Sequence, residues 1–338
     1  MAYNFNEIKL EKGMYSERGR SFEQTLEALD PNENYKGTPY EGLDAFQRQL
    51  KRFDIKVRGA GSDVVEKFFS TSESAVLFPE YVSRSVKAGM EEGNILPSIT
   101  ATVTRFDGMD YRSIYSAASE DDKSLRYVGE GAAIPQTEVR ASDHLVSLKK
   151  RGRMLCASYE AIRFQKLDLF TVTLKQIGAH IAKQQFNDAI TALTTGAAAS
   201  DPADKDKFGL PDVMKLWQAL LPYELNTLIV SPDNITKMMS NTYFSNSDFG
   251  MKIGSPDGFK TGLGFDIIIA KDQQKLAVGF DKNYALEMVV AQDIAVDSDR
   301  LIDKQLERTA ITTISGFSKI IGDAVKTLNF TVTQNTGA

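Results

Sequence analysis

The chain has 338 residues, 42% apolar and 25% charged, so it is long enough to bury a substantial core and favours two domains over one. Forty Lys and Arg against 45 Asp and Glu give a formal charge of −5, which argues against a dedicated nucleic-acid-binding protein. The single cysteine, Cys156, excludes an intrachain disulfide and a cysteine metal cluster. No apolar run approaches the roughly 18 residues of a membrane span, and the N-terminus lacks the apolar core of a signal peptide.

Residues 1–75 are expected to form an arm. They are polar at first and broken by glycine and proline, and a capping box at Ser21 and Gln24 predicts one short helix.

A second helix of about four turns is predicted to begin at Thr38, because Pro39 follows in the first helical position. It carries a narrow apolar stripe. A stripe on an arm needs a surface to lie on, so three of its members are candidate contacts with a neighbouring subunit: Leu43, Phe46 and Leu50.

A long β-loop is predicted next. Residues 76–98 hold one helix, and from residue 99 to 106 the period changes to two with many β-branched residues. Residues 111–115 and 125–148 are strand-like as well. We therefore expect residues 99–150 to form an extended loop that reaches away from the body.

The tip of this extended loop is acidic and its returning end is basic. The tip carries Glu120, Asp121, Asp122 and Lys123. The returning end carries Lys149, Lys150, Arg151 and Arg153. Both runs are most simply solvated faces. Their opposite charges also support the hypothesis that the tip of one subunit docks on the basic strand of its neighbour, which makes all eight residues candidate contacts between subunits.

The strongest signal in the chain is an amphipathic helix over residues 168–195. Apolar residues recur at steps of three and four, Asp168 is placed as an N-cap, and Gly196 ends the helix. At 1.5 Å per residue such a helix is roughly 40 Å long, a strut around which the other elements are arranged.

A compact α/β unit is predicted over residues 209–292, followed by returning strands to residue 338. The predicted helices and strands of the unit alternate: 211–221, 227–230, a helix after 232, 265–270, 276–280 and 284–291.

No grouping of residues typical of catalysis appears. His144 and His180 have no motif partner, and a lone histidine is more often a packing or surface residue than a catalyst. Phosphate loops, nucleophile elbows and metal-binding motifs are missing from the sequence. We expect no catalytic, cofactor-binding or metal-binding residue, and no enzyme.

Four stretches resemble the major capsid protein family of tailed bacteriophages. The most similar in wording is YVGEGAAIP at 127–135, on the returning side of the extended loop. VSLK at 146–149, SYEAI at 158–162 and LIVSP at 228–232 follow in the family's order. The resemblance spans roughly residues 75–328.

That resemblance implies an α+β, Hong Kong 97-type capsid fold. Its parts would be an N-terminal arm (1–75), the start of the peripheral domain (76–98), the extended loop (99–150), a peripheral domain with its spine helix (151–208, helix 168–195), an axial domain (209–292), and return strands with a tail (293–338).

The resemblance also implies a function. Hexamers and pentamers of the chain would close an icosahedral shell around double-stranded DNA without sequence-specific binding, with portal, scaffolding and decoration or head-completion proteins as partners. The chain would be assembled in the host cytoplasm and reside in the virion, with no cofactor and no membrane contact. Some family members cross-link a lysine of the extended loop, a role for which Lys123 is suitably placed, although no matching asparagine is identified.

Three alternatives remain. An encapsulin has the same fold and encloses an enzyme, but the long N-terminal segment argues against it. An α/β enzyme would show a deep pocket with convergent polar groups. A tail or baseplate protein would form tubes or discs. The N-terminal segment itself is interpreted as an arm rather than a scaffold-like segment removed on maturation.

Overall fold

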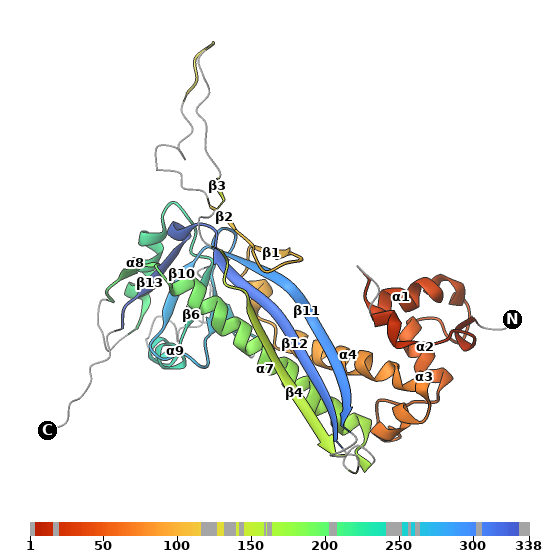
Figure 1. Ribbon diagram of the computed structural model, residues 1–338. Helices are drawn as coiled ribbons and strands as arrows, with labels where there is room; N and C mark the ends of the chain where they lie inside the picture. Colours follow the sequence, from red (N-terminus) through yellow and green to blue (C-terminus); the bar gives the residue numbers. More distant parts are fainter. Residues whose placement is uncertain are drawn as a thin grey trace. The chain divides into compact units, whose positions relative to one another are not determined.

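The computed structural model describes most of the chain: residues 4–15, 20–115, 127–131, 140–141, 145–158, 160, 164–202, 208–240, 252–255, 258–260, 264–301 and 306–330. The chain divides into two compact units. Unit 1 comprises Met1–Asn94, Lys150–Lys183 and Asp293–Thr313, and unit 2 comprises Ile95–Lys149, Gln184–Gln292 and Ile314–Ala338. Elements labelled in Figure 1 that contribute residues to both units are α7 (Leu167–Thr194), β11 (Leu286–Leu301), β12 (Leu306–Lys319) and, by its first residue, β4 (Lys149–Ser158).

The N-terminal part of unit 1 is helical and has a core of its own. Its helices are α1 (Phe22–Leu29), α2 (Ala45–Arg52), α3 (Ser72–Ala75) and α4 (Leu77–Glu92), with 3₁₀ turns η1 (Asn4–Asn6), η2 (Lys12–Tyr15), η3 (Asn32–Tyr35) and η4 (Val65–Phe69). The capping box predicted at Ser21 is confirmed, because its hydroxyl accepts from the Gln24 backbone and the Gln24 side chain returns to the Ser21 backbone.

The second predicted helix begins later than expected. Residues after Thr38 form turns, and Gly42 takes a φ of +83°, which interrupts a helix. The cap is Asp44, whose carboxylate accepts from the Gln47 backbone N–H at 2.7 Å, so α2 has eight residues instead of about four turns.

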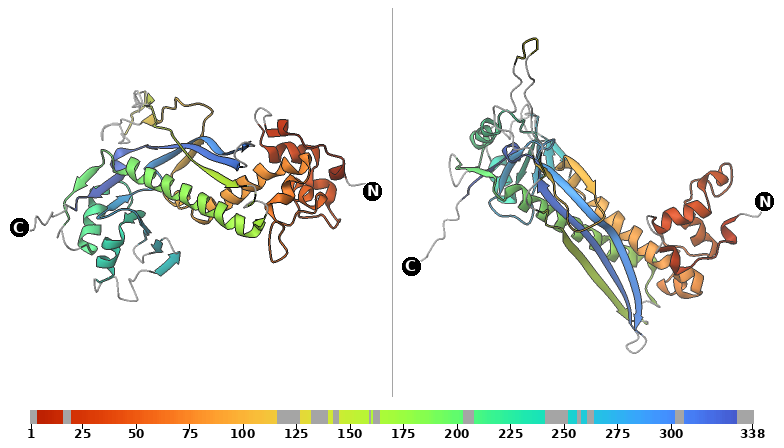
Figure 2. Two further views of the ribbon diagram at one scale, coloured as in Figure 1. Left: turned by 60° about the horizontal axis from the view of Figure 1, so that its bottom comes forward. Right: turned by 45° about the horizontal axis from the view of Figure 1, so that its top comes forward.

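Helices α4 and α7 cross with their backbones in contact in unit 1 (Figures 1 and 2). A Cβ on Gly89 would lie 2.1 Å from the Lys175 carbonyl oxygen, and a Cβ on Gly178 would lie 2.1 Å from that of Val86. Only glycine allows this approach. The long helix predicted over 168–195 is confirmed to within one residue at each end, although Asp168 lies inside its first turn rather than at the cap.

A four-stranded sheet has the order β1-β11-β12-β4, with β1 at Thr102–Arg105 and β4 at Lys149–Ser158. Strand β1 pairs parallel with the start of β11, Thr102 opposite Glu287. Strand β11 is longer than the predicted stretch 284–291. Within the predicted extended loop (99–150), β2 (Ile114–Tyr115) and β3 (Arg140–Ala141) form an antiparallel pair.

A seven-stranded mixed sheet forms the centre of unit 2 in the order β5-β13-β10-β6-β9-β8-β7. Its strands are β5 (Ala198–Ser200), β6 (Thr227–Val230), β7 (Lys252–Ser255), β8 (Gly258–Lys260), β9 (Asp266–Ile269), β10 (Ala277–Phe280) and β13 (Val325–Leu328). The remaining helices are α8 (Leu210–Leu220), α9 (Pro232–Met239), η5 (Leu96–Ser98) and η6 (Gly322–Ala324).

The central strands β6 and β10 of this sheet are buried on both faces, which explains the continuous apolar run of β6. Leu228 and Val230 belong to a core shared with α8, whereas Ile229 belongs to a second core shared with the C-terminal turns of α7. Strand β6 is fully buried along its length, as is typical of a strand covered on both sides. The predicted alternation of helices and strands after residue 209 is thereby confirmed.

Candidate assembly surfaces

Within the described residues, no group of His, Cys, Asp and Glu is arranged to hold a metal ion. None of the helices described there is both long and apolar enough to cross a membrane. The features that stand out are surfaces: side chains that the chain exposes although they are apolar, and charged side chains near the base of the extended loop.

Two of the three apolar candidates of the N-terminal segment, Phe46 and Leu50 on α2, are not part of such a surface. Phe46 and Leu50 are 4% and 6% exposed and belong to the core of unit 1, and Leu43 is half-buried. The guanidinium of Arg84 lies 4.5 Å from the Phe46 ring centre and covers it. The prediction that these side chains are exposed for contact with a neighbouring subunit is wrong for Phe46 and Leu50. They are already buried, because the segment expected to be an arm folds against α4.

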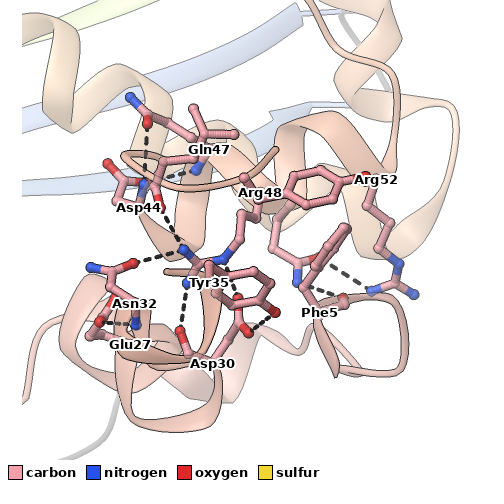
Figure 3. A network of polar contacts seen from close by, with 12 residues as sticks. Phe5, Glu27, Asp30, Asn32, Tyr35, Asp44, Gln47, Arg48 and Arg52 are labelled. Atoms are coloured by element: carbon pink, nitrogen blue, oxygen red, sulfur yellow. Dashed lines mark hydrogen bonds and ion pairs between the residues drawn. The ribbon is translucent and has the colours of Figure 1, made fainter. Parts of the chain in front are cut away.

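A buried polar network joins α2 to the C-terminal end of α1 and to η3 in this N-terminal part (Figure 3). The fully buried Arg48 donates to Asp30 Oδ2 at 2.5 Å, to the Asp30 carbonyl at 2.6 Å and to Asn32 Oδ1 at 2.7 Å. Its guanidinium also lies 4.1 Å from the Tyr35 ring centre, while the Tyr35 hydroxyl donates to Asp30. Burial and that hydrogen bond raise the pKa of Tyr35 to about 12. Each polar group is satisfied, so this region needs no partner to complete it.

The basic returning end of the extended loop is partly engaged within its own chain. Lys149 Nζ lies 2.8 Å from Asp188 Oδ1 of α7, in a groove of about 330 Å³ within unit 2. At the same groove Lys319 donates to the Thr195 carbonyl, and burial lowers the pKa of Lys319. Lys149 is thus held by a local carboxylate.

The other basic candidates lie on β4, where Lys150 and Arg153 are exposed and Arg151 is half-buried. The acidic candidates Glu120, Asp121 and Asp122, together with Lys123, lie outside the described residues, so the pairing of tip and basic strand stays a prediction. Within the stretch that resembles the capsid family, Tyr127 is 99% exposed.

Helix α8 and its C-cap residue Leu221 expose an apolar stripe that was not predicted from the sequence. Met214, Trp217 and Leu221 are 40%, 49% and 56% exposed, whereas Val213, Leu216 and Leu220 are fully buried. The exposed residues recur at steps of three and four, so they lie on one face, beside the face that packs on the sheet. The sequence could have indicated this surface, because the helix has two apolar stripes and only one of them is needed to pack on the sheet.

A second exposed apolar set lies at the start of α7 in unit 1. Phe164, Leu169 and Val172 are 77%, 61% and 62% exposed. Contiguous apolar side chains of this kind mark interaction sites more often than solitary ones do.

Comparison with known proteins shows the family to which the chain that carries these surfaces belongs. Residues 142–327, more than half of the chain, match the family described as phage capsid protein. The chain belongs to the phage capsid protein family. No curated protein is significantly similar in sequence.

Three solved structures show the same fold. A virus-like particle from Pyrococcus furiosus matches with a TM-score of 0.51 and 15% identity, over 74% of this chain and 98% of that one. The capsid of a native GTA particle matches with 0.51 and 14%, over 73% and 90%. Gordonia phage Cozz matches with 0.52 and 14%, over 70% and 86%. The likeness confirms the predicted α+β, Hong Kong 97-type capsid fold.

The family match identifies the role of the chain as that of a phage major capsid protein, a structural component of the virion. The virus-like particle from Pyrococcus furiosus and Gordonia phage Cozz match with nearly equal TM-scores, 0.51 and 0.52, so the encapsulin alternative is not better supported than the phage one.

Proposed function

We propose that the chain self-assembles into hexamers and pentamers that close an icosahedral shell around double-stranded DNA, and that it acts through its interfaces rather than as an enzyme. In this proposal residues 209–292 form the axial domain at the centre of each ring. Residues 151–208 and the return strands form the peripheral domain, and residues 99–150 reach a neighbouring subunit.

The observation that carries the proposal is the apolar face of α8. Met214, Trp217 and Leu221 are left exposed by the helix's own sheet, because that sheet packs on a different face, the one formed by Val213, Leu216 and Leu220. In a ring of copies related by rotation, the exposed face of one subunit is buried on a different surface of the next subunit, and such contacts between two different surfaces close the ring. An interface of this kind needs roughly 1,000 Å² or more in total, which requires further surfaces such as the start of α7 and the extended loop.

The formal charge of −5 fits a shell that encloses DNA without binding it tightly, because tight non-specific binding requires many contacts from Lys and Arg to phosphate. Portal, scaffolding and decoration or head-completion proteins are the partners that such a shell would use.

Negative-stain electron microscopy of the chain expressed alone, with size-exclusion chromatography, tests the proposal. Closed shells or rings of capsomer size are expected, and nucleic acid rather than an enzyme cargo would separate a phage shell from an encapsulin. A chain that stays monomeric, both alone and together with the proteins encoded beside it, would contradict the proposal.

A finer proposal concerns the extended loop. We infer that the acidic tip at residues 120–122 docks on the basic strand of a neighbour, where Lys150 and Arg153 are exposed. Reversing the charge of the tip to lysine should block shell formation while the subunit stays folded. Reversing Lys150 and Arg153 as well should restore assembly, and unimpaired assembly of the first variant would dismiss the pairing.

A further inference from the structure

One buried carboxylate in unit 2 collects hydroxyl groups from the base of the extended loop. Glu287, at the start of β11, is 5% exposed. Its Oε1 accepts from Thr104 Oγ1 at 2.5 Å and from the Tyr111 hydroxyl at 2.7 Å. Its Oε2 accepts from Ser113 Oγ at 2.5 Å. One side chain thereby holds three points along the outgoing strand of the loop.

Such an arrangement is unfavourable unless every bond is made. A buried carboxylate loses the hydration of its charge, and hydrogen bonds to the ionised oxygens must replace it. The hydroxyl of Tyr111 is held strongly enough by burial and by Glu287 that its pKa is raised. The three hydroxyl groups are therefore held at the same carboxylate, and breaking one of these hydrogen bonds leaves the buried charge of Glu287 with fewer donors.

The returning strand is tied to the same place. The buried Val146 donates its backbone N–H to the Tyr111 carbonyl at 2.8 Å. The turn between Thr104 and Tyr111 is closed by the rings of Phe106 and Tyr111, whose centres lie 5.4 Å apart. Strands β2 and β3 pair immediately beyond this point. Both strands of the loop therefore leave unit 2 from a single fixed base.

We propose that Glu287 is a positioning residue for assembly: it fixes the direction in which the extended loop leaves unit 2, so that the loop reaches the neighbouring subunit. This inference rests on the proposed function, since it gives the loop a partner on a second copy. Backbone pairing between β2 and β3 holds the two strands together beyond the sheet, whose nearest strands in the sequence are β1 and β4. Backbone pairing ties β1 to β11 as far as Phe106. Beyond it, the hydroxyls of Tyr111 and Ser113 link the outgoing segment to β11 through Glu287.

Hydrogen exchange on the unassembled subunit tests the positioning directly. In Tyr111→Phe, Ser113→Ala and Glu287→Gln, exchange at the Val146 amide and at residues 111–115 should become faster by about tenfold or more, the loss expected for one charge-assisted bond. Exchange in the central strands β6 and β10 and the temperature of thermal unfolding should change less than exchange at the base of the loop. Tyr127→Phe removes a hydroxyl from an exposed position of the same loop and is the matched control.

The assembly readout uses the same variants. Fewer shells from Tyr111→Phe and Glu287→Gln, with normal shells from Tyr127→Phe, is the expected result. Unchanged exchange at the base, or faster exchange throughout unit 2, would overturn the inference, the latter because Glu287 would then be only a core residue. Faster exchange with normal shells would also overturn it. If the unchanged protein forms no shell under any condition, the proposed function fails, while the exchange data still decide whether Glu287 holds the loop.

Discussion

Helices α2 and α8 are both short and amphipathic, yet they use their apolar residues differently. Helix α2 has one stripe, and its Phe46 and Leu50 are buried inside unit 1 beside the Arg48 network. Helix α8 has two stripes, of which one packs on the sheet and the other is exposed. An apolar stripe therefore indicates an interface only when the chain has already buried a different face of the same helix.

The largest effect on stability is expected from a substitution in the buried Arg48 network of unit 1. Arg48→Ala would leave Asp30 buried without its cation, and breaking one partner of a buried pair costs about 3–5 kcal/mol. Urea unfolding of the isolated subunit measures this loss. Lys51→Ala, an exposed position on the same helix, should stay within about 0.5 kcal/mol. A small effect of Arg48→Ala would mean that the N-terminal part is not closed by this network.

The helix crossing in unit 1 gives the next largest effect. Gly178→Ala places a Cβ 2.1 Å from the Val86 carbonyl oxygen, so α4 and α7 must separate, at a cost of about 3 kcal/mol, the upper end of the range for overpacking. Thermal unfolding monitored by circular dichroism measures it. Gly93→Ala is the control, because its added Cβ would meet no atom within 4 Å. Equal stability of the two variants would show that the helices tolerate a wider crossing.

The same crossing region predicts a dependence on pH. Tyr81 is buried and donates to the Leu167 carbonyl at 2.8 Å, and burial raises the pKa of Tyr81 to about 12. Its ordinary pKa is about 10, so between pH 10 and 12 the unfolded chain has lost a proton that the folded chain keeps. The stability contributed by Tyr81 is complete below about pH 10 and falls by up to about 3 kcal/mol as pH rises to about 12.

Urea unfolding at several alkaline pH values checks this dependence. In Tyr81→Phe the free energy of unfolding should fall less steeply with rising pH, whereas Tyr127→Phe, at a fully exposed position, should leave the slope unchanged. Because burial raises the pKa values of Tyr15 and Tyr35 as well, some decline should remain in Tyr81→Phe. Identical slopes in the two variants would contradict a buried, protonated Tyr81.

Local periodicity predicts the long elements well and the buried polar contacts poorly. Helix α7 is recognisable because 28 residues repeat one pattern, and β6 because both its faces are apolar. Arg48 looks like an ordinary surface residue, since its partner Asp30 lies 18 positions away and no spacing rule connects them. Glu287 is harder still, because its donors are 174 to 183 positions distant. Such contacts exist only once the fold brings the segments together.

The exposed stripe of α8 should show almost no effect on stability and a complete effect on assembly. Trp217→Glu should change the free energy of unfolding by less than about 0.5 kcal/mol, because the side chain is half exposed, yet it would place a charge in the proposed interface. Gln218→Glu adds the same charge at the next exposed position and should still assemble. As Trp217 is the single tryptophan, its fluorescence in the unchanged protein should shift to shorter wavelengths when subunits associate, since the indole leaves water. Shells that form with Trp217→Glu, or form without a spectral shift, would show that α8 faces solvent in the assembled particle, and the start of α7 and the extended loop would then have to supply the contacts between subunits.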